Sequence, residues 1–587
     1  MTTTVPKRID LDRERAAPKP PLRSTGSLRP AARPLAFLMG AVACISPAVA
    51  DIGSALELVP RDAIGAFIVP SLKRLSDDLS TCLERVDRAE ALLVGRPIDL
   101  AKSRMGIGGG VRDDGAMLGV LRRGDGATPI ATLLVPVTDA EAFLGGSFDR
   151  ESVPGLVRRP GGPALHAATV VRGDRRWVAL SESKAGVDGL HADPAAAAHH
   201  RARLGSAAER LLVNADVVAW LDGAAVVLGL DQGIEQGRAA VAGGPALAAA
   251  ERVRRLAESI DVAAFAWDVD ALGLLGRSVL RLRPESELGL ALGRPRTGAA
   301  ATNLLGRLPD VMPYLAVGID IAAFGGIDGI TALAALVGVP AETVASWGVP
   351  KSMRQVQFAV YPSRLGVAVG GALNDAALVV VDDDPAASKA ALLSRIEGLA
   401  GEAPGVRRDV AVERGRAVKD AGIADAFEIR ETALPGGDPQ ALAIWAMFRS
   451  ILFGSRGLHG LAGNVTDAVV MTFSQRPDVW RRAIEAAGGA GRNGLGGGDV
   501  VVAMREYGLD GVDIEAICGV AQLGRLAAQI AATIPGGAGA VPVLDAGSEP
   551  IYAALRLEPA EIHGAVVVPS GIVGVAVDFA KRSQIGR

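Results

Sequence analysis

The sequence predicts an α+β protein in which helices pack on antiparallel sheets, built as two similar halves by duplication. Three observations support this fold class. Apolar runs rich in β-branched residues recur along the chain, short turns pair several of them, and others lead directly into segments of helical periodicity. With 587 residues the chain is too long for one ordinary core, which favours two or more domains.

The first 50 residues have the features of a secretory signal peptide. A basic, proline-rich leader precedes the apolar stretch Pro34–Ala50, which ends in Ala-Val-Ala. We expect cleavage before Asp51, because the apolar run is shorter than the roughly 20 residues of a spanning helix. An uncleaved anchor and lipidation at Cys44 are the alternatives. The mature protein is therefore expected to be exported, periplasmic or extracellular, with no membrane span after cleavage.

The rest of the chain divides into a first α+β domain, residues 51–300, and a second, residues 301–587. A faint duplication suggests this division, because the segment Leu58–Val69 has a counterpart in Leu308–Val317. In both places a helical stretch follows, and then hairpins and a strand that leads into a helix. The pattern breaks at Arg294–Gly298, which marks the expected boundary.

Four segments share a strand followed by a helix-capping residue and a helix: Ala131–Leu144, Arg176–Val187, Ala376–Leu392 and Ala468–Trp480. One of them contains three consecutive acids, Asp382, Asp383 and Asp384, before Pro385. Proline suits the first helical position, so Asp384 is the expected N-cap. Thr138 and Glu141 fit a capping box in a sister segment. Capping is favoured over metal binding, because the sister segments do the same without a triple acid.

Short connections predict antiparallel hairpins within Val262–Arg283, Gln355–Val369 and Ile551–Val568. Helical periodicity predicts seven helices: Leu72–Leu93, Pro194–Leu212, Ile234–Ser259, Pro385–Leu399, Pro439–Leu452, Pro477–Ala487 and Ile514–Ile534. Cys82 and Cys518 both fall in such helical segments. Free buried thiols are favoured over a disulfide, because two cysteines do not make a framework.

The charge balance argues against nucleic acid as a partner. The formal net charge is −3, but eight of the 62 Lys and Arg and three of the 65 Asp and Glu lie in the first 50 residues, so the remainder carries −8. Nucleic-acid affinity comes mainly from neutralised phosphates, and no long basic run is present.

No catalytic, cofactor-binding or metal-binding residue is assigned from the sequence. The six histidines lack ligand spacing, and the adjacent His199 and His200 are expected to be solvated on a helix. There is no G-x-S-x-G elbow and no phosphate loop. The glycine clusters Gly106–Gly110 and Gly494–Gly498 lack the third glycine of a dinucleotide fingerprint and are interpreted as turns. Ca²⁺ at Asp375 with Asp382–Asp384 is a minor hypothesis.

The mature chain resembles a family of large exported bacterial proteins, of the type best represented among planctomycetes, whose function is unknown. The resemblance spans most of residues 51–587 and is carried by Leu58–Ala63, Val69–Leu72, Leu134–Asp139, Phe143–Leu144, Ala468–Phe473 and Val568–Ser570. It implies an exported α+β protein and brings no catalytic residues with it.

These observations favour a non-enzymatic binding or scaffold protein of the periplasm or envelope. Its expected partner is an envelope protein, a lipid or a polysaccharide. One alternative is a carrier of an apolar ligand such as a lipid, which requires an apolar cavity. A second alternative is a hydrolase with two facing carboxylates that meet only in the fold.

Overall fold

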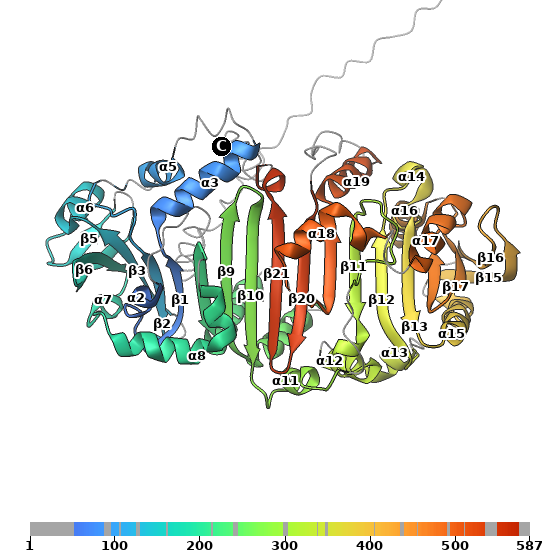
Figure 1. Ribbon diagram of the computed structural model, residues 1–587, viewed down its shortest axis with the longest axis horizontal. Coiled ribbons are helices and arrows are strands. Elements are labelled where there is room, and N and C mark those ends of the chain that lie inside the picture. The colour runs from blue at the N-terminus through green and yellow to red at the C-terminus, as the bar shows by residue number, and fades with distance from the viewer. Residues whose placement is uncertain are drawn as a thin grey trace, which may run out of the picture.

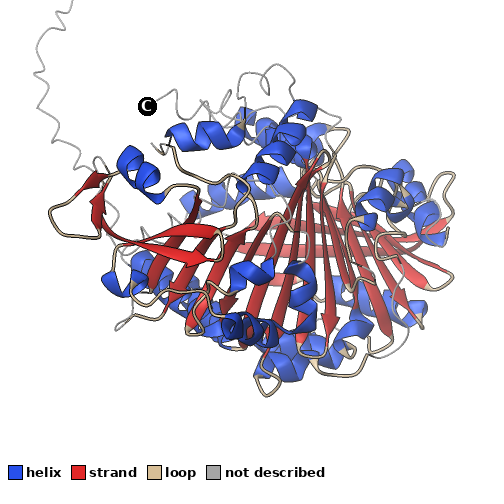
Figure 2. Ribbon diagram, turned by 60° about the vertical axis from the view of Figure 1, so that its left-hand side comes forward, coloured by secondary structure: helices blue, strands red, loops and turns tan. Residues whose placement is uncertain are grey.

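A computed structural model describes residues 52–574 of the chain except 87–95, 105–106, 108, 125–128, 160–161, 213–214, 239–244, 297–302, 337–338, 347–349, 404, 435–438, 455, 490–493, 510 and 534–548. The predicted signal peptide and its alternative lipidation site, Cys44, lie outside the described residues. Within them the strands form one continuous antiparallel sheet with helices on both faces (Figure 2). The predicted α+β class is confirmed.

Seven strands from the first part of the chain lie side by side in the spatial order β7–β3–β2–β1–β8–β9–β10. Their bounds are β1 (Ala63–Val69), β2 (Met117–Arg122), β3 (Ile130–Val137), β7 (Arg175–Ser181), β8 (Val217–Asp222), β9 (Ile260–Asp270) and β10 (Gly273–Leu282). Beyond β7 the sheet continues through β6 (Ala164–Arg172), β5 (Leu156–Arg158) and β4 (Asp149–Arg150).

The second part repeats this order as β18–β13–β12–β11–β19–β20–β21. The bounds are β11 (Leu315–Asp320), β12 (Met353–Val360), β13 (Ala376–Asp382), β18 (Ala468–Thr472), β19 (Ile514–Cys518), β20 (Ile551–Glu558) and β21 (Glu561–Pro569). Beyond β18 lie β17 (Leu458–Val465), β16 (Ile423–Ala433), β15 (Val406–Ala417) and β14 (Gly401–Ala403).

The two halves meet edge to edge at the centre of the sheet. Strand β10 pairs with β21 from Gly273↔Pro569 to Arg281↔Glu561, so each half ends in the strand that joins it to the other (Figure 1). The predicted pair of similar halves is confirmed by the matching strand orders. Because the sheet is unbroken across this pair, the halves share hydrogen bonds as well as side-chain contacts.

Helices connect the strands in both halves. In the first half they are α2 (Ile52–Leu56), α3 (Leu72–Val86), α5 (Pro97–Arg104), α6 (Ala140–Ser147), α7 (Lys184–Val187), α8 (Pro194–Leu212), α9 (Gly223–Arg238), α10 (Pro245–Glu258) and α11 (Glu287–Leu292). In the second half they are α12 (Ile327–Leu336), α13 (Ala341–Ser346), α14 (Gly366–Gly370), α15 (Pro385–Glu397), α16 (Pro439–Phe453), α17 (Pro477–Gly488), α18 (Asp499–Glu506) and α19 (Val520–Thr533).

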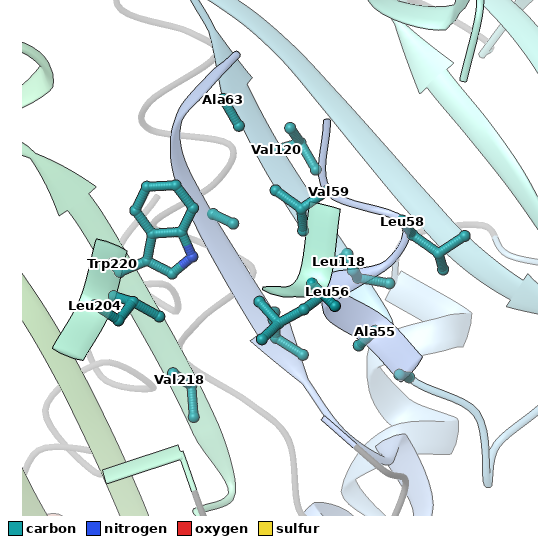
Figure 3. Packing of buried hydrophobic residues seen from close by; sticks show 14 of the residues in the cluster. Ala55, Leu56, Leu58, Val59, Ala63, Leu118, Val120, Leu204, Val218 and Trp220 are labelled. Atoms are coloured by element: carbon teal, nitrogen blue, oxygen red, sulfur yellow. The ribbon is translucent and has the colours of Figure 1, made fainter. Parts of the chain in front are cut away.

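Each half buries its own apolar cluster between the sheet and a helix. In the first half Leu204 of α8 packs with Val218 and Trp220 of β8, as Figure 3 shows. In the second half Trp480 of α17 lies in the cluster that includes Val379 of β13. Aromatic residues are scarce in this chain, and these two tryptophans lie within the clusters, where each is 1% exposed.

The prediction that His200 of α8 is solvated is wrong. Its side chain is fully buried against the Trp220 ring, and Nε2 lies 3.1 Å from the carbonyl oxygen of Val59. Burial lowers the pKa of His200, so the ring is held neutral. Neighbouring His199 is exposed, as the 100° rotation between adjacent helical residues requires.

Two predicted elements are wrong in type. Ile514–Cys518 is strand β19 and not the start of a helix, which begins only at Val520. Gly366–Gly370 is the short helix α14 and not the second strand of a hairpin. Both are short apolar runs, for which periodicity cannot separate a buried strand from a helix.

The triple acid is structural. Asp384 is the N-cap of α15, and its Oδ1 accepts from the backbone N–H of Ala387 at 3.0 Å. Asp382 is fully buried and accepts from the Asp384 N–H and the Ser388 hydroxyl. In the sister unit the cap of α6 is Asp139, which accepts from the N–H of Glu141 and Ala142, and not Thr138 as predicted.

We expect the substitution Asp384→Ala to lower the free energy of unfolding by about 1 kcal/mol, because it removes the N-cap of α15. The neighbouring substitution Asp383→Ala is the control. Its side chain is 67% exposed and pairs with Arg354, so its loss should cost less than about 0.5 kcal/mol. Urea denaturation of both variants measures the difference, and equal costs would contradict the capping role.

Candidate functional site

Helix α16 carries apolar side chains that are exposed on every side. Residues 443–448, Ala-Ile-Trp-Ala-Met-Phe, are all exposed, and the exposed fractions of Ile444, Trp445, Met447 and Phe448 are 47%, 42%, 47% and 51%. Six consecutive helical residues cover the full circumference, since each rotates by about 100° from the last. A helix that is apolar all round is normally buried.

The sequence holds this helix in place mainly by its C-terminal turn. The segment after α14 donates backbone N–H groups from Ala372 and Leu373 to the carbonyl oxygens of Ile451 and Leu452, each at 2.8 Å. Gly371, with φ +77°, makes the close approach feasible, because a Cβ there would lie 2.4 Å from the Gly454 nitrogen. The last turn of α16 is thus anchored while residues 443–448 project.

Two contacts with β16 fix the rotation of α16. The Trp445 Nε1–H donates to a Glu431 carboxylate oxygen at 3.3 Å, and the Arg449 guanidinium donates to the Glu431 backbone carbonyl at 3.0 Å. Arg408 pairs with the same carboxylate, so Glu431 links the helix to the β15–β16 hairpin. The exposed face of Trp445 is therefore presented in a fixed orientation.

Helix α14 packs beside α16 (Figure 1). Leu365, which precedes α14, and Val369 on it are exposed. We call the α16 surface the set Leu365, Val369, Ile444, Trp445, Met447 and Phe448. Single exposed apolar residues need no explanation, but a contiguous group indicates an interaction site.

The densest acidic cluster of the sequence does not form a site. Asp375 and Asp382 lie at opposite ends of β13, so they cannot share a cation. Asp375 faces Arg476, whose Nη1 is 3.5 Å from Oδ2, and burial raises the pKa of Asp375. The minor Ca²⁺ hypothesis at Asp375 and Asp382–Asp384 therefore finds no shared position.

A second group of carboxylates gathers where β8 begins and β9 ends. Burial, together with the nearby carboxylates of Asp268 and Asp78, raises the pKa of Asp216 to about 7. Asp216 accepts from the Val269 N–H at 2.6 Å, and Asp268 pairs with Arg277 at 2.5 Å. Asp216 is only 2% exposed and is therefore out of reach of a substrate. We interpret Asp216 and Asp268 as structural residues.

A cavity of about 80 Å³ lies between the β9–β10 turn and α18, with a mostly apolar lining that includes Leu272, Leu275, Met504, Tyr507, Val567 and Pro569. Ligand pockets are usually about 300–1,000 Å³. This cavity is too small for a lipid chain.

Glu558, Glu561 and His563 bring their ligand atoms close enough together to hold a metal ion. They are the one such group within the part of the chain that the structure describes. These three residues do not match any helical or loop ligand spacing, so no motif in the sequence indicates them. The signal was the predicted hairpin itself, since pairing across the turn brings positions 558, 561 and 563 onto one face.

Comparison of the chain with protein-family models, curated proteins and solved structures gave no match. Among the described helices none combines the length and the apolarity needed to cross a membrane.

Proposed function

We propose that the chain is a non-enzymatic, exported binding protein that docks a partner protein through the α16 surface. The observation that carries this proposal is the complete exposure of the apolar residues 443–448. Burying one large apolar side chain is worth about 1.5–3 kcal/mol, so the burial of four such side chains in an interface would contribute substantially to the free energy of binding. Export is proposed on the leader and apolar stretch that end at Ala50.

A protein groove suits α16 better than a lipid surface. A helix that lies in a membrane interface keeps a strongly charged face toward water, but residues 443–448 have no charged side chain. The helix has 15 residues, fewer than the roughly 20 needed to span a bilayer. A groove in another protein covers a helix on several sides, and interface cores favour Trp, Phe and Met.

The proposal predicts that the double substitution Ile444→Ser/Phe448→Ser releases the chain from its complex. In extracts of the native host, size-exclusion chromatography should show wild-type protein in a larger assembly and the variant near the mass of the monomer. The reason is that two serines remove most of the apolar contact without touching the anchored last turn of α16.

The matched control is Leu290→Ser on α11, where the exposed leucine lies far along the chain from the α16 surface. Surface substitutions of this kind change stability by no more than about 0.5 kcal/mol, so both variants should unfold like wild type. If the double variant still elutes with the assembly, or if wild type elutes as a monomer, the proposal is wrong.

A further inference from the structure

The β20–β21 hairpin places three potential metal ligands together. The turn Pro559-Ala560 places Glu558 directly opposite Glu561. Two residue pairs further from the turn, Arg556 lies opposite His563. Side chains alternate between faces along a strand, so all four point to one side of the sheet. One ligand atom from each of Glu558, Glu561 and His563 lies within 4.8 Å of the others.

His563 is aimed into this group with an unsatisfied nitrogen. The residue is 8% exposed, and Nε2 lies 3.2 Å from a Glu561 oxygen and 3.5 Å from Glu558 Oε2. No atom of the described residues makes a well-oriented hydrogen bond to Nε2. A buried polar nitrogen without a partner is costly, and an unseen ion is one of its ordinary explanations.

Arg556 orients one carboxylate without occupying its metal-facing oxygen. Its Nη2 donates to Glu558 Oε1, which leaves Oε2 directed toward His563. Arg281, opposite Glu561 on β10, is engaged by Asp261 at 2.5 Å. Arg210 of α8 adds a positive charge nearby. Arg556 therefore holds the Glu558 ligand from behind, which is a usual arrangement in metal sites.

We propose that Glu558, Glu561 and His563 bind a divalent transition metal ion of the Zn²⁺ class. Two carboxylates and one imidazole are a nitrogen–oxygen donor set that suits Zn²⁺, and three protein ligands leave a coordination position open. The ion would satisfy Nε2 and neutralise the paired glutamates at the turn of the central hairpin. This site is independent of the α16 surface.

Titration of metal-free, tag-free full-length protein with ZnCl₂, followed by calorimetry, tests the proposal. We expect one site in wild type and at least about tenfold weaker binding in His563→Gln and in Glu561→Gln, because the loss of an outer partner alone costs about 10–100-fold. The controls His191→Gln and Glu413→Gln remove one exposed histidine and one exposed carboxylate and should bind as wild type does.

Cobalt gives a second readout. Co²⁺ in the wild-type site should show ligand-field absorption that His563→Gln loses. Glu558→Gln serves if His563→Gln does not fold, because the Glu558 side chain is 37% exposed. The proposal is overturned if wild type binds no more Zn²⁺ than the ligand variants, or if binding falls equally in the controls.

Discussion

The substitution Arg505→Met is expected to lower the free energy of unfolding by about 3–5 kcal/mol, because it leaves the buried charge of Glu515 without a partner. The Glu515 side chain is fully buried on β19, and Arg505 of α18 pairs with both of its oxygens at 2.5 and 2.7 Å. The guanidinium also donates to the Gly496 carbonyl and to Asn303. Chemical denaturation at pH 7 measures the loss.

The double substitution Arg505→Met/Glu515→Met is the control for this prediction. Replacing both charges by apolar side chains of similar length removes the unpaired carboxylate, so most of the stability should return. A single variant that costs less than about 1 kcal/mol, or a double variant as unstable as the single, would show that the pair does not hold α18 on the sheet.

The substitution Asp216→Asn is expected to change how stability depends on pH. Burial raises the pKa of Asp216 from 3.8 to about 7, so the folded chain keeps this proton over an interval in which the unfolded chain loses it. The free energy of unfolding of wild type therefore falls as the pH rises from about 4 to about 7. Asparagine does not titrate. The free energy of unfolding of the variant, taken relative to that of wild type, should therefore rise by up to about 4 kcal/mol from pH 4 to pH 7.5.

Urea midpoints at pH 4, 5.5 and 7.5 measure this gain. Asp409→Asn removes a carboxylate that is 60% exposed and serves as the control for the change in net charge. If the difference between Asp216→Asn and wild type is the same at all three pH values, the Asp216 carboxyl does not carry the proton assigned to it.

Much of the fold follows from local patterns in the sequence. The Asp384 cap with Pro385 at the first helical position is a signal that acts within a few residues, and the structure places α15 where it predicts. The hairpin of β20 and β21 is equally local, because Pro559-Ala560 fits a two-residue turn. The similarity of the two halves is predicted for the same reason, since both halves use the same order of local signals.

Other features depend on contacts that no local pattern encodes. The run Ile514–Cys518 becomes a strand because β11 and β20 pair with it on either side. His200 is buried because α8 turns that face toward Trp220. The single sheet arises from the pairing of β10 with β21, which are separated by most of the second half of the chain.

The candidate site was beyond sequence reasoning for a related reason. The sequence predicted a helix at Pro439–Leu452, and α16 confirms it. Its apolar composition predicts burial in the core, however, and only the fold reveals that residues 443–448 face away from it. The disagreement between composition and exposure is the signal for an interface, and it needs both the sequence and the fold.

Site-specific photo-cross-linking from α16 tests the central claim most directly. A photoreactive phenylalanine analogue replaces Met447 in the chain expressed in its native host, and a second variant carries it at Leu290 as the control. We predict one adduct with a different protein of defined mass from position 447 and none from position 290. Adducts with lipid alone, an adduct of twice the mass of the chain, or no adduct above the control would each contradict docking of a partner protein on the α16 surface.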